Sequence, residues 1–174
     1  MKEFKSLIVI KQPIDVVWVS IRDKLPELGN YLNDIDKIFV EERQDLSNGD
    51  VSLVNIWKAK MKIPSVIKSI VDPGELSWTD EAKWLESQKD CLWKITPHFF
   101  KGRIQCYGTT EYRSAMGGRG TKICFSGQLA ISTEGMKGVP RYLENKLSVG
   151  IESLVSTVIP KNFRKITEAV PELL

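Results

Sequence analysis

The chain has 174 residues and a net charge of +3, from 25 basic and 22 acidic side chains. Hydrophobic residues make up 42% and charged residues 27%, which is typical of a globular domain and excludes an intrinsically disordered chain. The basic excess is small and forms no dense run, so we expect no nucleic-acid partner.

The N-terminal third predicts one strand, two helices and a hairpin. Residues 4–10 read as a strand that ends before Pro13. Apolar residues at helical spacing predict a helix over 14–25, and Pro26 ends it or begins a second short helix. Asn48-Gly49 between two alternating segments predicts a hairpin of strands at about 35–44 and 51–61.

The middle of the chain predicts a short helix and four further strands. "IPSVIKSIV" at 63–71 is amphipathic at helical spacing and stops at Asp72-Pro73-Gly74. Strand patterns follow at 76–87, 91–96, 103–114 and 121–132, and the glycine-rich segment 115–120 separates the last two. The short connections predict an antiparallel meander.

A long helix is predicted near the C-terminus, from about Pro140 to Ile166. Its apolar residues recur every three or four positions, and a proline suits the first turn of a helix. Such a helix is roughly 40 Å long, enough to cross a small domain, and Pro160 should bend or divide it. The element order predicts an α+β fold in one domain spanning 1–174.

This order resembles the helix-grip fold of the START, polyketide-cyclase and birch-pollen-allergen (SRPBCC) superfamily. "KIPSVIKSIV" at 62–71 and "MKGVPRYLENKLSVGIESLV" at 136–155 look like segments of bacterial START-like proteins of unknown function. The resemblance implies a curved, seven-stranded antiparallel sheet that wraps around the long C-terminal helix, with two short N-terminal helices and a cavity between sheet and helix. It also implies a hydrophobic small-molecule ligand.

Motifs for metal, nucleotide or triad chemistry are missing from the sequence. His98 is the single histidine, in a segment that reads as a turn between strands, and no nucleophile-elbow motif accompanies it. The glycines at 117–120 lack the Lys-Ser/Thr ending of a phosphate loop. Cys91, Cys106 and Cys124 show no metal-ligand spacing. We therefore predict no metal, no cofactor and no catalytic constellation.

Large apolar side chains occupy one face of the predicted strands and of the terminal helix. They can form an ordinary core, or they can line a pocket that a curved sheet cannot fill by itself. The leading hypothesis is a non-enzymatic carrier or sensor of a lipid, fatty acid or polyketide-like compound. The residues predicted to line its pocket are Trp57, Trp84, Trp93, Tyr107, Phe125, Leu147, Ile151 and Val155.

Polar residues on two strands leave an enzyme open as the second hypothesis. Asp80 alternates with apolar residues on one strand, and Glu111 and Arg113 share a strand face with Tyr107 on another. If these faces turn inward, a buried carboxylate can serve as acid or base, and the resemblance implies a cyclase or dehydratase as the kind of enzyme. If the faces turn outward, the same residues are ordinary solvated groups.

A third hypothesis is a module that binds a protein or, transiently, a membrane surface. Ile63, Val66, Ile67, Ile70 and Val71 form an apolar stripe beside nearby lysines. If the stripe is exposed, the protein should float with anionic liposomes and do so less at high salt, and a Val66→Asp, Ile67→Asp double variant should not. The same segment can instead be a lid over the cavity or part of the core. Failure of both proteins to bind, with the double variant unfolded, would show that the stripe is core and would exclude both the lid and the membrane contact. The sequence assigns no oligomeric state.

The sequence favours a reducing compartment. The apolar run at 7–10 is too short for the core of a signal peptide, and no segment approaches the ~20 apolar residues of a membrane span. The cysteines are odd in number and form no CxxC pair. We therefore predict a cytoplasmic protein.

Overall fold

The computed structural model describes residues 1–60, 65–68 and 76–174. Its helices are α1 (Ile14–Asp23), α2 (Leu25–Gly29), α3 (Ser65–Lys68) and α4 (Arg141–Ala169), with short 3₁₀ turns η2 (Met116–Gly118) and η3 (Val170–Leu173). Its strands are β1 (Lys2–Ile10), β2 (Ile35–Asp45), β3 (Val51–Ala59), β4 (Ser77–Leu85), β5 (Asp90–Pro97), β6 (Ile104–Ala115) and β7 (Gly120–Ile131). The predicted order of strands and of α1, α2 and α4 is confirmed.

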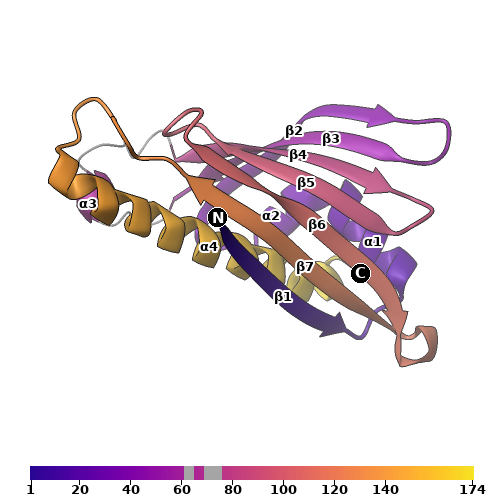
Figure 1. Cartoon of the computed structure of the whole chain (residues 1–174). Coiled ribbons are helices and arrows are strands. Elements are labelled where there is room, and N and C mark those ends of the chain that lie inside the picture. Colours follow the sequence, from indigo (N-terminus) through magenta and orange to yellow (C-terminus); the bar gives the residue numbers. More distant parts are fainter. Residues whose placement is uncertain (61–64, 69–75) are drawn as a thin grey trace.

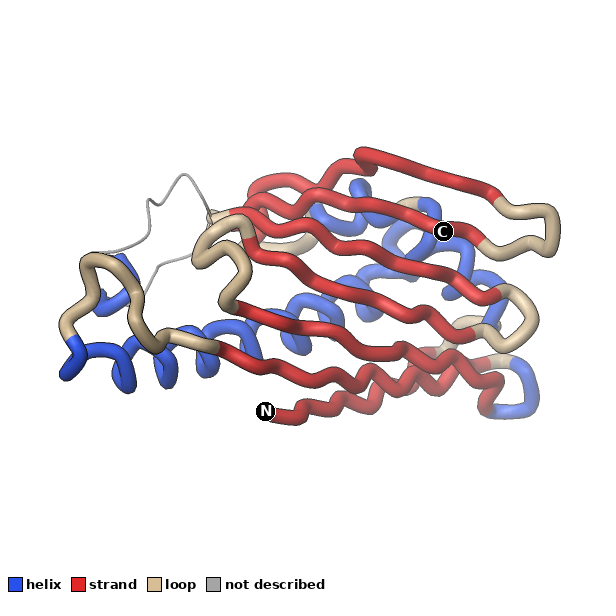
Figure 2. Tube along the Cα trace, turned by 45° about the horizontal axis from the view of Figure 1, so that its top comes forward, coloured by secondary structure: helices blue, strands red, loops and turns tan. Residues whose placement is uncertain are grey.

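The strands form one seven-stranded antiparallel sheet in the order β1-β7-β6-β5-β4-β3-β2. After β1 the chain crosses through α1 and α2 to the opposite edge, and it then returns strand by strand until β7 pairs with β1 (Figures 1 and 2). Figure 2 shows the helices on one side of this sheet. This is the helix-grip arrangement that the sequence predicted. We call the side that faces the helices the inner face.

The long helix α4 packs on the inner face through a stripe of residues spaced by about four. Leu147 and Ile151 are fully buried, and Val155 and Ile166 continue the stripe toward the C-terminus. This i, i+4 spacing places the side chains on one side of the helix. The helix runs unbroken through Pro160, so Pro160 does not divide it.

Two hydrophobic clusters form the core. One cluster joins α1, α2 and the C-terminal end of α4 to the sheet, and it contains Val17, Trp18 and Ile166. The other joins the middle of α4 to β5, β6 and β7, and it contains Leu147 and Ile151. Between them lie side chains that are only partly buried and touch both clusters, which leaves the junction less completely filled. The partly buried side chains at the junction are Ala59, Trp78 and Phe163.

Two glycines let a tryptophan lie flat against the inner face. Gly108 of β6 stands opposite Gly127 of β7 and opposite Trp93 of β5. A Cβ atom on Gly108 would lie 2.1 Å from the Ser126 carbonyl oxygen and 2.4 Å from Trp93 Cζ2. A side chain at this position is therefore incompatible with both the neighbouring backbone and the indole ring.

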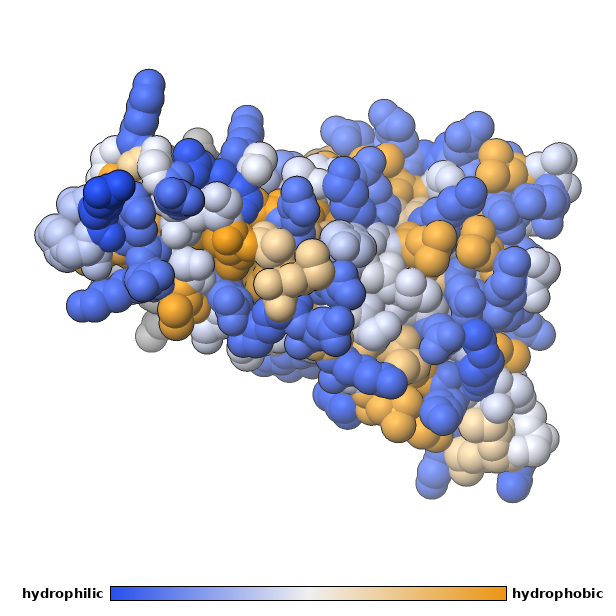
Figure 3. Space-filling model, viewed as in Figure 1, coloured by the Kyte–Doolittle hydropathy of each residue, from blue (hydrophilic) through white to orange (hydrophobic). Residues whose placement is uncertain are grey.

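The surface is largely polar on the side seen in Figure 3, where apolar side chains form small separate groups. None of the helices described is both long and apolar enough to cross a membrane. The helix predicted at 63–71 is described only over Ser65–Lys68, where it forms one turn beside α4. The side chains of its apolar stripe lie outside the described residues.

Candidate functional site

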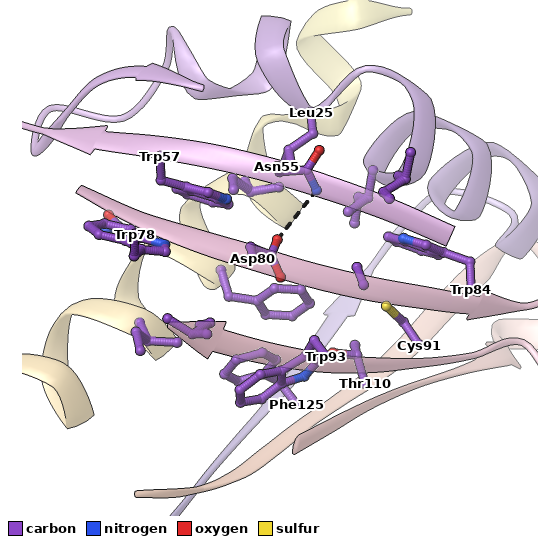
Figure 4. Close-up of a pocket in the computed structure, with 18 of the residues that line it drawn as sticks. Leu25, Asn55, Trp57, Trp78, Asp80, Trp84, Cys91, Trp93, Thr110 and Phe125 are labelled. Atoms are coloured by element: carbon purple, nitrogen blue, oxygen red, sulfur yellow. Dashed lines mark hydrogen bonds between the residues drawn. The ribbon is translucent and has the colours of Figure 1, made fainter. Parts of the chain in front are cut away.

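A cavity of about 80 Å³ lies at the junction of the two core clusters, between the sheet, α1, α2 and α4. It has room for several water molecules or a small ligand. Strands β3, β4, β5 and β6 supply most of its wall, and α4 covers it. Most of its large side chains are aromatic (Figure 4). The aromatic lining residues are Trp57, Trp78, Trp84, Trp93, Tyr112, Phe125 and Phe163.

Stacked aromatic rings join the sheet to α4 along one side of the cavity. The ring centroids of Trp93 and Phe125 are 4.8 Å apart, and those of Phe125 and Phe163 are 4.4 Å apart, with the rings nearly parallel in both pairs. On the other side Trp57 and Trp78 stack at 5.6 Å. These flat surfaces suit a planar or cyclic ligand body.

Asp80 places a carboxyl group in the middle of this apolar wall. Part of its surface is accessible, as expected for a cavity wall, but the carboxyl lies deep in the protein. Asn55 Nδ2 donates a hydrogen bond to Asp80 Oδ2 at 3.4 Å (Figure 4). Burial raises the pKa of Asp80 to about 6, and the hydrogen bond from Asn55 and the nearby indole N–H of Trp57, which does not reach normal hydrogen-bond geometry, oppose this rise.

Buried polar atoms without a protein partner gather around the same cavity. Within the described residues there are six such side-chain atoms, and all belong to residues of the cavity wall. By contrast, the indole N–H of Trp18, outside the wall, donates to Glu86 Oε2 at 2.7 Å. A buried polar atom left unpaired costs about 1–3 kcal/mol, so their concentration makes this cavity the candidate functional site. The six atoms are Asn55 Oδ1, Asn162 Oδ1 and Nδ2, and Nε1 of Trp57, Trp84 and Trp93.

Four of the eight predicted pocket residues line this cavity, namely Trp57, Trp84, Trp93 and Phe125. Three others lie on α4 and are buried elsewhere. Leu147 and Ile151 pack in the cluster of β5, β6 and β7, away from the cavity, and Val155 lines a second apolar cavity of about 30 Å³. This second cavity shares the side chains of Trp78, Ile95 and Ile159 with the first.

Three predicted residues lie on the outer face of the sheet and not in the cavity. Tyr107 is 44% exposed, and its hydroxyl donates to Gln128 Oε1 at 3.0 Å. Glu111 and Arg113 are exposed and paired with each other at 3.4 Å. Their placement as pocket or polar cavity groups was wrong because Tyr112, of the opposite parity on β6, is the side chain that faces inward.

Sequence reasoning missed two polar residues of the wall. Asn55 lies between Leu53 and Trp57 on the inner face of β3, and it is 1% exposed. Asn162 follows Val155 by two helical turns on the buried side of α4, and it is 2% exposed. An asparagine at an inward position of an apolar stripe was the signal for both, since such a residue needs a partner.

Other chemistry-bearing residues form no second site in the described part of the chain. Both ring nitrogens of His98 are hydrogen-bonded to hydroxyl groups, Nδ1 to Ser77 at 2.6 Å and Nε2 to Thr79 at 2.8 Å. No carboxylate therefore orients this ring as in a catalytic triad. Nowhere in the described ranges do three metal-ligating side chains gather. Cys91 lies in the cavity wall, where burial raises the pKa of its thiol and makes the reactive thiolate unfavourable.

The fold has well-defined relatives among solved structures, although no protein-family model and no curated protein sequence matches the chain. The Zhui aromatase/cyclase from Streptomyces sp. R1128 superposes with a TM-score of 0.68 at 10% identity, over 99% of this chain and 96% of the other. TTHA0849 from Thermus thermophilus superposes with a TM-score of 0.63 at 17% identity, over 98% of this chain and 95% of the other. Ara h 8.0201 superposes with a TM-score of 0.55 at 13% identity, over 98% of each chain.

These similarities span whole chains and establish the fold. The chain shares the helix-grip fold of these solved structures, as the sequence predicted. At such low identities they carry no residue role and no ligand from those proteins to this one.

Proposed function

We propose that the protein binds a hydrophobic small molecule in the cavity between its sheet and α4, as a carrier or sensor. One observation carries the proposal: every buried side-chain nitrogen or oxygen atom without a hydrogen-bond partner in the described part of the chain belongs to the wall of one aromatic cavity. An ordinary core would have apolar side chains at these positions. The fold agrees, since the helix-grip relatives include an aromatase/cyclase.

The size of the cavity favours a compact ligand with a single ring. About 80 Å³ is too small for an extended lipid chain, whereas stacked tryptophan and phenylalanine rings suit a flat molecule. A longer molecule would have to pass between Trp78 and Ile159, which separate this cavity from the smaller one beside Val155.

Filling the cavity should abolish binding while the fold persists. Ala82 lies on the inner face of β4 and lines the cavity, so a leucine there would occupy ligand space. We expect wild-type protein purified from its host to carry a bound small molecule in native mass spectrometry. Ala82→Leu should reduce the bound fraction at least about tenfold, equivalent to about 1.4 kcal/mol.

The matched control is Lys83→Ala, one residue along on the outer face of β4, where the side chain is exposed. It should retain the bound molecule. Circular dichroism would verify that both variants are folded. Wild-type protein without any bound molecule, together with no binding across a panel of ring compounds and lipids, would contradict the proposed function.

Asp80 supports catalysis as a second candidate function. Its carboxyl group faces the cavity, and a pKa of about 6 suits a general acid or base near neutral pH. The molecule extracted from Asp80→Asn protein should then be a substrate that wild-type protein converts. Recovery of the same unchanged molecule from both proteins would exclude this candidate and leave binding as the function.

A further inference from the structure

Among the described residues, Asp80 has no positive partner in the cavity. None of those that line the cavity is Lys, Arg or His. The helices α1, α2 and α4 contribute only uncharged side chains to the wall. The carboxyl is therefore surrounded by neutral groups, and in its ionised form it is a buried charge that lacks compensation.

The titratable groups that influence Asp80 do not supply a positive charge either. Cys91 on β5 and both Cys106 and Tyr112 on β6 face the same region, where burial raises the pKa of each and the charge of Asp80 adds to the rise. Glu81, the neighbour on β4, is negative and raises the pKa of Asp80. Strand β3 contributes uncharged Asn55 and Trp57. A positive charge here must come from the ligand.

Aromatic rings and amide oxygens surround the carboxyl group of Asp80. Trp57, Trp84 and Trp93 stand around Asp80 in the cavity wall (Figure 4). Trp57 stacks on Trp78 and Trp93 stacks on Phe125, so these rings supply a flat apolar enclosure for the body of a ligand whose nitrogen lies at the carboxyl group. The unpaired carbonyl oxygens of Asn55 and Asn162 are acceptors, which suit the N–H groups of an amine.

An anionic ligand fits the same wall poorly. The unpaired indole N–H groups could donate to a carboxylate, but that carboxylate would share a low-dielectric cavity with Asp80. Like charges in such surroundings disfavour each other, so one carboxyl group would have to bind a proton. The cavity therefore discriminates by charge and not only by shape.

We propose that the ligand is a hydrophobic organic amine, which binds as a cation with its nitrogen against the Asp80 carboxylate and its body between the tryptophan and phenylalanine rings. This inference rests on the proposed function and narrows its ligand class. The bound cation would form an ion pair with the Asp80 carboxylate, which has no positive partner among the described residues that line the cavity. Free fatty acids and other carboxylates are excluded as preferred ligands.

Isothermal titration calorimetry with three probes of matched shape tests the proposal. The probes are 2-phenylethylamine, 2-phenylethanol and 3-phenylpropanoate, which share a phenyl ring and differ in charge. At pH 7.5 the amine should bind at least about tenfold more tightly than the carboxylate, with the alcohol between them. Asp80→Asn should remove the advantage of the amine over the alcohol.

Affinity for the amine should also depend on pH. Since the pKa of Asp80 is about 6, the carboxylate is protonated at pH 5, and amine binding should weaken by about tenfold between pH 7.5 and pH 5. The alcohol should show no such change. The indole N–H signals of Trp57, Trp84 and Trp93 in nuclear magnetic resonance spectra should shift with the amine, whereas the Trp18 signal, held by Glu86, should move least.

The outcomes separate this proposal from the broader one. If the alcohol binds at the indole signals of the cavity but the amine binds no better than the carboxylate, the amine proposal is wrong and hydrophobic binding stands. If Asp80→Asn keeps the full preference for the amine, the charge of Asp80 is not its cause, and the proposal fails. If no probe binds, the amine proposal is overturned, and failure of the ligand panel would then contradict the proposed function as well.

Discussion

The Gly108→Ala variant is expected to lose more than about 3 kcal/mol of folding free energy, or to fail to fold. The added methyl group would lie 2.1 Å from the Ser126 carbonyl oxygen and 2.7 Å from Gly127 Cα. Both atoms belong to the backbone of β7, which is held between β1 and β6. Strand β7 cannot move away without breaking its ladder, so the strain falls on the sheet itself.

Two other substitutions calibrate this expectation in urea unfolding experiments. A Cβ on Gly127 would meet the outer ends of the Trp93 and Phe4 rings at 2.5 and 2.6 Å, and rings can tilt, so Gly127→Ala should cost less. Thr109→Ala, next to Gly108 but with no inward side chain to alter, should change stability by only about 0.5 kcal/mol. Equal stability of Gly108→Ala and Thr109→Ala would contradict the close approach of β6, β7 and Trp93.

The Asp80→Asn variant should be more stable than the wild type at pH 7.5 by up to roughly 3 kcal/mol. An aspartate carboxyl group in an unfolded chain has a reference pKa of 3.8, whereas the pKa of Asp80 in the folded protein is about 6. The folded state therefore binds the proton more tightly than the unfolded state. The stability that this proton contributes is fully present below about pH 4 and is lost as the pH rises through 6. Asparagine has no such loss, and it can still accept the hydrogen bond from Asn55.

Urea unfolding of both proteins between pH 4 and pH 8 checks this expectation. The difference in unfolding free energy should be small at pH 4 and should reach its maximum above pH 7. Glu111→Gln is the control, because Glu111 is exposed on the outer face of β6, where it pairs with Arg113 at 3.4 Å, so the substitution should produce little pH-dependent difference. A difference between wild type and Asp80→Asn that stays constant with pH would show that Asp80 does not titrate in this range.

Together these features indicate that the protein gives up stability at its cavity. The carboxyl group of Asp80 lacks a positive partner, and amide atoms of Asn55 and Asn162 lack hydrogen bonds. Apolar residues at these three positions would make the folded protein more stable. Such local conflicts with the rules of folding are concentrated at functional sites. A ligand that satisfies these groups should therefore also raise the unfolding temperature.

Much of the fold was predictable from local patterns. The Asn48-Gly49 pair predicted one hairpin, and Gly49 has the positive φ of a turn, 87°, although Asn48 does not and the loop between β2 and β3 spans 46–50. Alternation placed Trp78, Ala82 and Trp84 on one face of β4, and Asp80 had to share that face. These signals are local because they depend on turn geometry and on the two-residue period of a strand.

The inward face of β6 was not predictable in the same way. Tyr107 and Tyr112 have opposite parity, so the strand carries an aromatic residue on each face, and its period cannot select one. Pairing with β5 and β7 decides the question, because it fixes which side of β6 continues the buried face of its neighbours. That register turned Tyr107 to solvent and Tyr112 inward.

The position of the cavity along α4 was likewise a tertiary outcome. The sequence determined that α4 is a long helix with one apolar side, and this side includes both Leu147 and Asn162. Its period says nothing about where the facing sheet is filled, since that depends on side chains from β3 to β7 and from α1. Packing filled the sheet opposite Leu147 and left space opposite Asn162, so the sequence determined the elements and the tertiary contacts decided the site.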